Sequence, residues 1–173
     1  IQRCLAGDVT REIYVAFLTQ AYHHVRHTVP LLMAVGARLP DRQRWLQPAV
    51  LHYLEEEAGH DEWILNDIAQ AGGDRAAVAA SEPAIATEAM IAYAYDTVTR
   101  RNPLGFFGMV HVLEGTSVAL ALMAADRIQQ TLGLPTRAFT YLRSHGELDK
   151  EHVNDLAAIL ARLAEAEDRE AVI

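Results

Sequence analysis

The stretch LGFFGMVHVLEGTSVALALMAAD, residues 104–126, says more about the fold than any other part of the sequence. Between Leu104 and Asp126 its only charged residue is Glu114. A run this long and this apolar predicts one long core helix, which we expect to extend to about Leu132. An isolated carboxylate in apolar surroundings is costly unless it is paired, protonated or bound to a metal. We therefore expect Glu114 to be buried and to have a partner.

Helical patterns also dominate the sequence on both sides of this stretch. We expect a helix beginning after Asp8 or Thr10 and kinked or restarted at Pro30, followed by helices over residues 31–39, 41–71, 84–101, 104–132 and 136–166, with a short helical piece over residues 74–80. Proline and glycine mark most of the boundaries, as at Gly72-Gly73 and Gly133. The sequence therefore predicts an all-α chain that forms a single helical bundle over residues 1–173.

Composition limits the classes of function. The chain has 173 residues, 51% of them hydrophobic, which is enough for one domain with a core. Its net charge of −8 argues against binding to nucleic acid or to an anionic membrane. The longest purely apolar run, Val118 to Ala125, is too short to span a bilayer. Cys4 is the only cysteine, which excludes an internal disulfide and a cysteine-cluster metal site, and we expect a cytoplasmic setting.

The sharpest candidate for chemistry lies near the C-terminus. His145, Asp149 and His152 are spaced by four and three residues. On a helix this spacing places all three within a stripe of roughly 60°. Two imidazoles and a carboxylate on one narrow face are typical of a metal-ligand set. The alternative is a solvated polar face, because the surrounding residues are also polar.

A second candidate is the pair Glu57 and His60. If residues 41–71 form one helix, these two side chains share a face, and Glu-x-x-His is a pairing that presents ligands to metals in helical bundles. Glu56 faces nearly the same way, so either glutamate is a candidate for the first carboxylate. A charged helix surface is the alternative interpretation, since Glu55, Asp61 and other acidic residues surround the pair.

Together these segments offer three carboxylates and three histidines. Mixed nitrogen and oxygen donors favour iron or manganese over zinc, copper, magnesium or calcium. The set suits two metal ions with positions left for dioxygen and a substrate. The predicted catalytic and metal-binding residues are Glu57, His60, Glu114, His145, Asp149 and His152. His24 and His27 are candidates for lining a pocket, although histidines at such positions more often have no chemical role. His111 is expected to be a core histidine or a partner of a ligand.

At these positions the chain resembles the heme-oxygenase-like di-iron oxidases and oxygenases. The family pattern is a glutamate and a histidine on one helix, a lone glutamate on a later helix, and His-x3-Asp-x2-His near the C-terminus. The chain departs from it in one respect: some members have the first glutamate seven residues before the histidine, where this chain has Tyr53, so the first carboxylate is left open. The resemblance implies a heme-oxygenase-like bundle, about two Fe(II)/Fe(III) ions per chain, and a homodimer. It also implies that dioxygen is used to oxidise a small organic acid, amino acid or amine.

Two other classes of function remain as alternatives. One is a metal-free hydrolase or cofactor-binding protein of the TenA or PqqC type, which shares the fold. A TenA-like hydrolase needs a cysteine nucleophile in its pocket, and we expect Cys4, near the start of the sequence, to be badly placed for that role. The other is a ferritin-like iron-binding protein, which would need two Glu-x-x-His motifs where this chain has one convincing copy.

Overall fold

The computed structural model describes the backbone of residues 2–173 and the side chains of residues 4–145 and 153–173. Every regular element in this described backbone is helical, which confirms the all-α prediction. The elements are α1 (Gln2–Leu5), α2 (Arg11–Val25), α3 (Thr28–Arg38), η1 (Asp41–Leu46), α4 (Gln47–Glu57), α5 (His60–Gln70), α6 (Arg75–Ala79), α7 (Ile85–Arg100), α8 (Gly105–Leu132), η2 (Thr136–Ala138), α9 (Thr140–Ala161) and α10 (Ala166–Val172).

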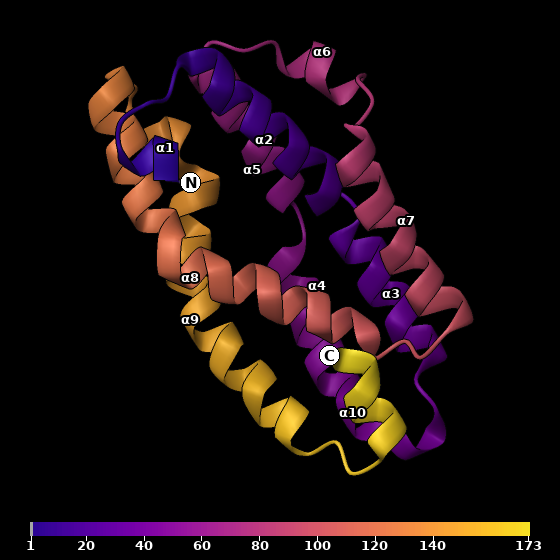
Figure 1. Ribbon diagram of the computed structural model, residues 1–173. Coiled ribbons are helices and arrows are strands. Elements are labelled where there is room, and N and C mark those ends of the chain that lie inside the picture. Colours follow the sequence, from indigo (N-terminus) through magenta and orange to yellow (C-terminus); the bar gives the residue numbers. More distant parts are fainter. Residues whose placement is uncertain (1) are drawn as a thin grey trace.

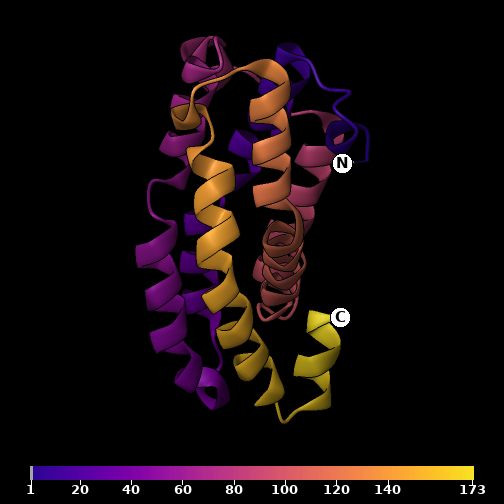
Figure 2. The ribbon, with the colours of Figure 1, turned by 90° about the vertical axis from the view of Figure 1, so that its left-hand side faces the viewer.

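The helices enclose two apolar clusters that meet near the middle of the bundle. One cluster joins α2, α5, the second half of α8 and the start of α9. The other joins α3, α4, α7, the first half of α8 and the later part of α9. The long helices α8 and α9 lie side by side and pass from one cluster to the other (Figures 1 and 2). Polar residues placed midway along α8 and α9, or at the junction of α4 and α5, therefore lie where the two clusters meet.

Several boundaries follow from local chemistry as expected. Thr10, and not Asp8, is the N-cap of α2, because its hydroxyl accepts a hydrogen bond from the backbone N–H of Ile13 at 3.3 Å. Pro30 falls in the first turn of α3, where a missing N–H costs nothing, so the restart comes at Thr28. Gly133 ends α8 in the left-handed conformation, with a φ of 63°.

The expected continuous helix over residues 41–71 is wrong. The structure divides this segment into η1, α4 and α5. Helix α4 ends at Glu57, Ala58 is extended, and Gly59 has a φ of 89°. A left-handed backbone of this kind is accessible to glycine without the steric cost that a side chain would bring. Glu57 and His60 are therefore the last and first residues of two different helices.

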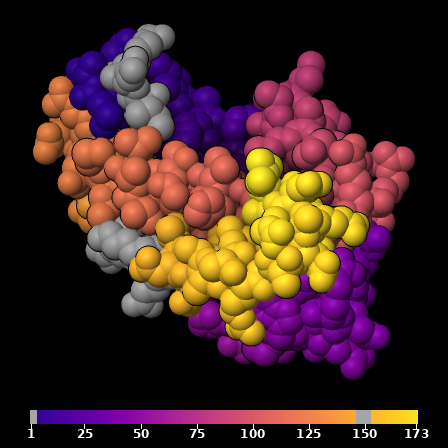
Figure 3. All heavy atoms as spheres, turned by 60° about the horizontal axis from the view of Figure 1, so that its bottom comes forward, coloured from indigo at the N-terminus to yellow at the C-terminus, as the bar shows by residue number. Residues whose placement is uncertain are grey.

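The expected helix over residues 136–166 is also divided: η2 and α9 cover it as far as Ala161, and a separate helix, α10, begins at Ala166 and extends beyond the expected end. Asp168 of α10 is fully buried and accepts hydrogen bonds from Arg42 at 2.9 Å, from Asn102 at 2.8 Å, and from Gln43. These partners lie in η1 and in the connection between α7 and α8. Asp168 thus draws α10 back against α8, where Figure 3 shows it in yellow.

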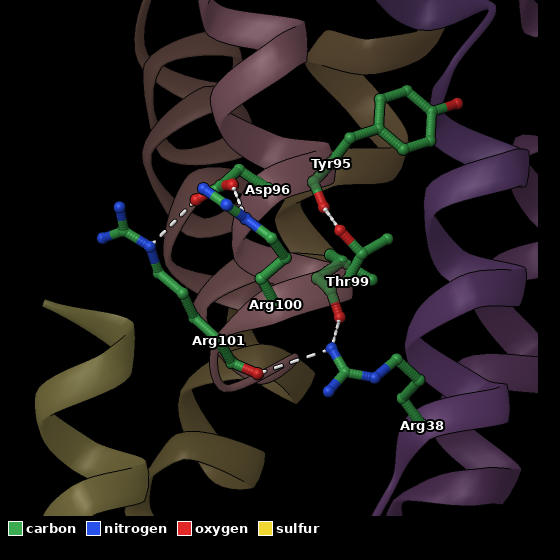
Figure 4. Close-up of polar contacts among 7 residues, drawn as sticks. Arg38, Tyr95, Asp96, Thr99, Arg100 and Arg101 are labelled. Atoms are coloured by element: carbon green, nitrogen blue, oxygen red, sulfur yellow. Dashed lines mark hydrogen bonds and ion pairs between the residues drawn. The ribbon is translucent and has the colours of Figure 1, made fainter.

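A basic side chain satisfies the free carbonyl groups at the end of α7. Arg38, the last residue of α3, donates to the carbonyl oxygens of Val98 and, at 3.4 Å, Arg101 (Figure 4). Asp96 accepts from both Arg100 and Arg101 on the exposed side of the same turn. The last carbonyls of a helix have no partner within it, so Arg38 both caps α7 and fixes it to α3.

Helix α8 is long and strongly apolar, although part of its surface is exposed. By length and composition alone its 28 residues are long and apolar enough to cross a membrane, which the short apolar run in the sequence had not indicated. Here the helix packs against α1, α7, α9 and α10 and carries the buried Glu114. Part of its apolar surface is exposed, with Val112 at 65% and Met123 at 52% exposure.

Candidate metal centre

Three of the predicted ligands come together at the junction of the two apolar clusters. Glu57, His60 and His145 each offer one donor atom, and these atoms all lie within 4.8 Å of one another. Two donors on opposite sides of an ion, each about 2.1 Å from it, are roughly 4.2 Å apart, so only a small contraction is needed to close this group on a metal. The rings of His60 on α5 and His145 on α9 meet edge to face, with centroids 4.8 Å apart and an interplanar angle of 67°.

His60 is the most deeply buried member, with 2% of its surface exposed. Its Nδ1 lies 3.2 Å from Glu57 Oε2, so the carboxylate accepts a hydrogen bond from an Nδ1–H group. In that neutral tautomer Nε2 carries the lone pair, and this atom is buried with no hydrogen-bond partner among the described residues. A buried nitrogen left in this state is costly, and binding a metal ion would remove that cost.

The backbone of α9 orients His145 in the same way. Its Nδ1 lies 3.0 Å from the carbonyl oxygen of Tyr141, one turn earlier, which fixes the Nδ1–H tautomer. Nε2 is then the nitrogen that carries the lone pair suited to metal binding. A histidine that binds a metal through one ring nitrogen usually donates a hydrogen bond from the other nitrogen to a carboxylate or a backbone carbonyl. His60 and His145 both have such a partner at Nδ1.

Glu114 is buried, as the sequence predicted, with 7% exposure. It accepts a hydrogen bond from the Tyr53 hydroxyl at 3.3 Å. Burial, and then the negative charge of Glu114, raise the pKa of Tyr53 above its ordinary value. Tyr53 is a buried core residue on the same helix as Glu57, one turn earlier, and its hydroxyl joins that helix to Glu114.

A cavity of about 440 Å³ lies against this group. Its polar lining includes His24, Tyr53, Glu57, Glu114, Tyr141 and His145, and its apolar lining includes Phe17, Leu32, Phe106, Leu120 and Ile128. His24 was judged from the sequence to be more often inert, yet it faces this cavity. Its Nδ1 lies 3.2 Å from the carbonyl oxygen of Gln20, four residues earlier, which repeats the pattern seen at His145. Burial lowers the pKa of His24, against the opposing effects of that carbonyl and of Glu57.

Three other residues considered from the sequence, Glu56, His27 and His111, fall outside this group. Glu56 pairs with His52 at 3.3 Å near the surface, so Glu57 is the glutamate that faces the cavity. His27 lies 3.0 Å from the Tyr95 hydroxyl, away from the cavity. His111 is exposed, so its interpretation as a core histidine is wrong. The side chains of two predicted ligands lie outside the described residues: Asp149 and His152.

Cys4 is closer to the cavity than its position in the sequence suggested. Helix α1 packs on α8, and Cys4 is among the residues that line the cavity. The expectation that Cys4 is badly placed is therefore wrong about its position, because Cys4 lines the cavity. Its side chain nevertheless packs against the apolar cluster of α2, α5 and α8.

Comparison with known proteins agrees with this architecture. Residues 15–173 match a protein family described as iron-containing redox enzymes. A solved structure of a domain of unknown function with a heme oxygenase-like fold, from Shewanella denitrificans, superposes with a TM-score of 0.86 at 29% sequence identity. That match covers 99% of this chain and 74% of the other, and it confirms the predicted heme-oxygenase-like fold. Comparison with curated proteins gave no match.

Proposed function

The chain belongs to the family of iron-containing redox enzymes, and we propose that it is a non-heme di-iron oxidase or oxygenase that uses dioxygen to oxidise a small organic molecule. One observation carries this proposal. Glu57, His60 and His145 converge from three helices in a buried place, and His60 Nε2 has no hydrogen-bond partner there among the described residues. Mixed carboxylate and imidazole donors of this kind suit iron.

The number of metal ions rests on the whole ligand set. Glu57, His60 and His145 are enough for one ion with open positions. Glu114, which lines the same cavity as Glu57, supplies a carboxylate for a second ion. Asp149 and His152, predicted from their spacing after His145, complete the set of six and remain predictions.

The residues of this chain hold and shield the centre. Glu57 orients His60 by accepting its Nδ1–H, and the Tyr141 carbonyl does the same for His145. The apolar walls of α2 and α8 limit the access of water to the oxidising site. A bound ferrous pair would supply two of the four electrons that take dioxygen to two waters. The substrate would give up the other two electrons, and an external electron donor would be needed to restore the ferrous state.

The cavity also indicates the kind of substrate. Its lining is largely apolar, and it contains no arginine or lysine among the described residues. A charged amino acid would leave its charges poorly paired in these walls, except at the end near Glu57 and Glu114. We therefore favour an organic acid or amine with an apolar body, whose one polar group lies at the metal end.

The decisive experiment is iron loading under anaerobic conditions, followed by mass-spectrometric metal analysis and by stopped-flow absorption on mixing with oxygen. We expect about two irons per chain and a transient visible band, both lost in Glu114→Gln and His145→Asn. Glu56→Gln is the matched control, because Glu56 pairs with His52 near the surface and should leave both signals intact.

Other outcomes would identify the alternatives. Failure of the wild-type chain to take up iron specifically would favour the metal-free hydrolase or cofactor-binding class. Uptake of many irons per chain, with oxidation that needs no organic substrate, would favour a ferritin-like function. Uptake that survives both Glu114→Gln and His145→Asn would place the iron elsewhere in the molecule and refute this site.

A further inference from the structure

Tyr53 stands among the donors of the candidate centre. It is 3% exposed, it lies one turn before Glu57 on α4, and it lines the same cavity as Glu57 and Glu114. Its phenol oxygen lies 3.3 Å from Glu114 Oε2. Helix α4 thus brings an oxygen atom to the carboxylate that α8 carries.

The separation of these two oxygen atoms would also suit two ligands of one metal ion. Hydroxyl-to-oxygen hydrogen bonds usually measure about 2.7–2.8 Å, so 3.3 Å is loose for one. Two neighbouring oxygen ligands, each about 2.1 Å from one ion, lie roughly 3.0 Å apart at a right angle and roughly 3.4 Å apart in a tetrahedron. Tyr53 and Glu114 are therefore spaced as two neighbouring ligands of one metal ion would be.

The chemistry of the phenol group agrees with this geometry. A phenolate is an anionic oxygen donor, and tyrosinate is a known ligand of iron. Glu57, one turn after Tyr53 on α4, already accepts a hydrogen bond from His60. Tyr53 is a second oxygen donor on α4, and it would fill a coordination position beside Glu114 in addition to those filled by Glu57, His60 and His145.

We propose that Tyr53 binds ferric iron directly through its phenolate oxygen, beside Glu114. The proposal rests on the di-iron function proposed above. On binding, the O–H bond of Tyr53 breaks, an iron–oxygen bond forms, and the proton leaves to solvent, with no change in oxidation state. The phenol group is thus a ligand that the Glu-and-His pattern of the sequence did not include.

A spectroscopic experiment tests this assignment without any measurement of turnover. The protein is loaded with ferrous iron, oxidised in air, and examined by visible absorption and resonance Raman spectroscopy, with iron content measured on the same sample. Wild type should show a phenolate-to-iron(III) charge-transfer band with enhanced tyrosinate ring vibrations. Tyr53→Phe should lose the band, keep its fold, and bind iron about tenfold more weakly or worse. Tyr141→Phe is the control and should keep the band, because Tyr141 also lines the cavity, and the variant retains both the backbone carbonyl that orients His145 and the ring that packs on it.

A second variant shows whether weaker iron binding in Tyr53→Phe comes from the lost oxygen donor or from misfolding. Tyr53→Glu retains an oxygen donor without the chromophore, so it should restore iron affinity while remaining without the band. A wild-type ferric protein with two irons and no band, or a band that survives in Tyr53→Phe, overturns the assignment and leaves the di-iron proposal standing. A wild-type protein that binds no iron overturns both, and the metal analysis distinguishes the two cases.

Discussion

The backbone N–H of Tyr141 donates a 2.8 Å hydrogen bond to Asp67 Oδ2, and the N–H of Thr140 donates one of 3.0 Å to the other carboxylate oxygen. Asp67 is fully buried in α5, and both donors belong to the first turn of α9. Helix α5 starts with His60, and His145 follows Tyr141 by one turn. The carboxylate therefore fixes the start of α9 to the helix that carries the opposing histidine.

We predict that Asp67→Ala lowers the free energy of unfolding by about 2–4 kcal/mol, because two buried hydrogen bonds to a charged group are lost. It should also weaken iron binding, since the histidines of α5 and α9 lose their common anchor. Denaturant unfolding and iron titration measure the two effects. Asp74→Ala is the matched control: Asp74 accepts from Ala76 and Ala77 in an exposed cap of a short helix, and should cost about 1 kcal/mol or less. Equal losses in both variants would contradict the prediction.

The break at Gly59 gives a second prediction. Gly59 and Gly133 both have positive φ, and a Cβ added at either would meet no atom within 4 Å. Alanine at each position should therefore cost about 1–2 kcal/mol of stability through backbone strain alone. Only Gly59→Ala should also weaken iron binding, because Gly59 lies between Glu57 and His60. Thermal unfolding and iron titration of the two variants make the comparison, and iron binding that falls equally in both would show that the break has no part in building the site.

Asp168 gives a prediction about pH. Desolvation raises the pKa of this carboxyl, but the hydrogen bonds from Asn102, Arg42 and Gln43 outweigh it and hold the pKa below its ordinary value. A lowered pKa contributes stability above the unfolded-state pKa of about 3.9, and that stability is lost as pH falls through the folded pKa. Asp168→Asn should lower stability at pH 7 by about 2–4 kcal/mol and flatten the loss below pH 4. Asp41→Asn, at a side chain that is 94% exposed, should change neither when unfolding is followed across pH 2–7.

The cavity gives a prediction about where an apolar molecule binds. Ala121 is buried on the cavity side of α8, whereas Ala119 is exposed on the same helix. Ala121→Leu should fill part of the cavity and weaken binding of an apolar fluorescent probe, with iron content unchanged. Ala119→Leu should leave probe binding intact. Fluorescence titration of the iron-loaded proteins provides the measurement, and equal probe affinity in both variants would show that the probe binds outside this cavity.

The features that were predictable from sequence have local causes. The Thr10 cap, the end of α8 at Gly133 and the burial of Glu114 each follow from a short stretch that needs no distant partner. The helix break at Gly59 was missed because one glycine costs a helix only about 1 kcal/mol relative to alanine, and packing elsewhere decides whether the helix continues. The cap provided by Asp67 had no local signal at all, since its partners lie 73 and 74 residues away.

The positions of His24 and Tyr53 beside the cavity could not be predicted from the sequence, for a different reason. Helical spacing shows which residues share a face, but not whether that face meets another side chain or an empty space. Each position is typical of an ordinary interior residue in a helix, and only the tertiary arrangement of α2, α4 and α8 places both residues on one cavity. The converging donors of Glu57, His60 and His145 were predicted as a set, although the first two meet across a break and not along one helix.

That break has a consequence for how such a site changes during evolution. In one unbroken helix, adding a residue between Glu57 and His60 would turn one side chain by about 100° relative to the other and separate them. Here α4 packs on α3 while α5 packs on α2 and α9, so each helix has its own anchor. The two residues between them form a joint that can lengthen or shorten while both helices stay in place. The distance in sequence between carboxylate and histidine is thus free to drift among descendants of this chain, and the geometry of the pair is inherited from the packing of the helices.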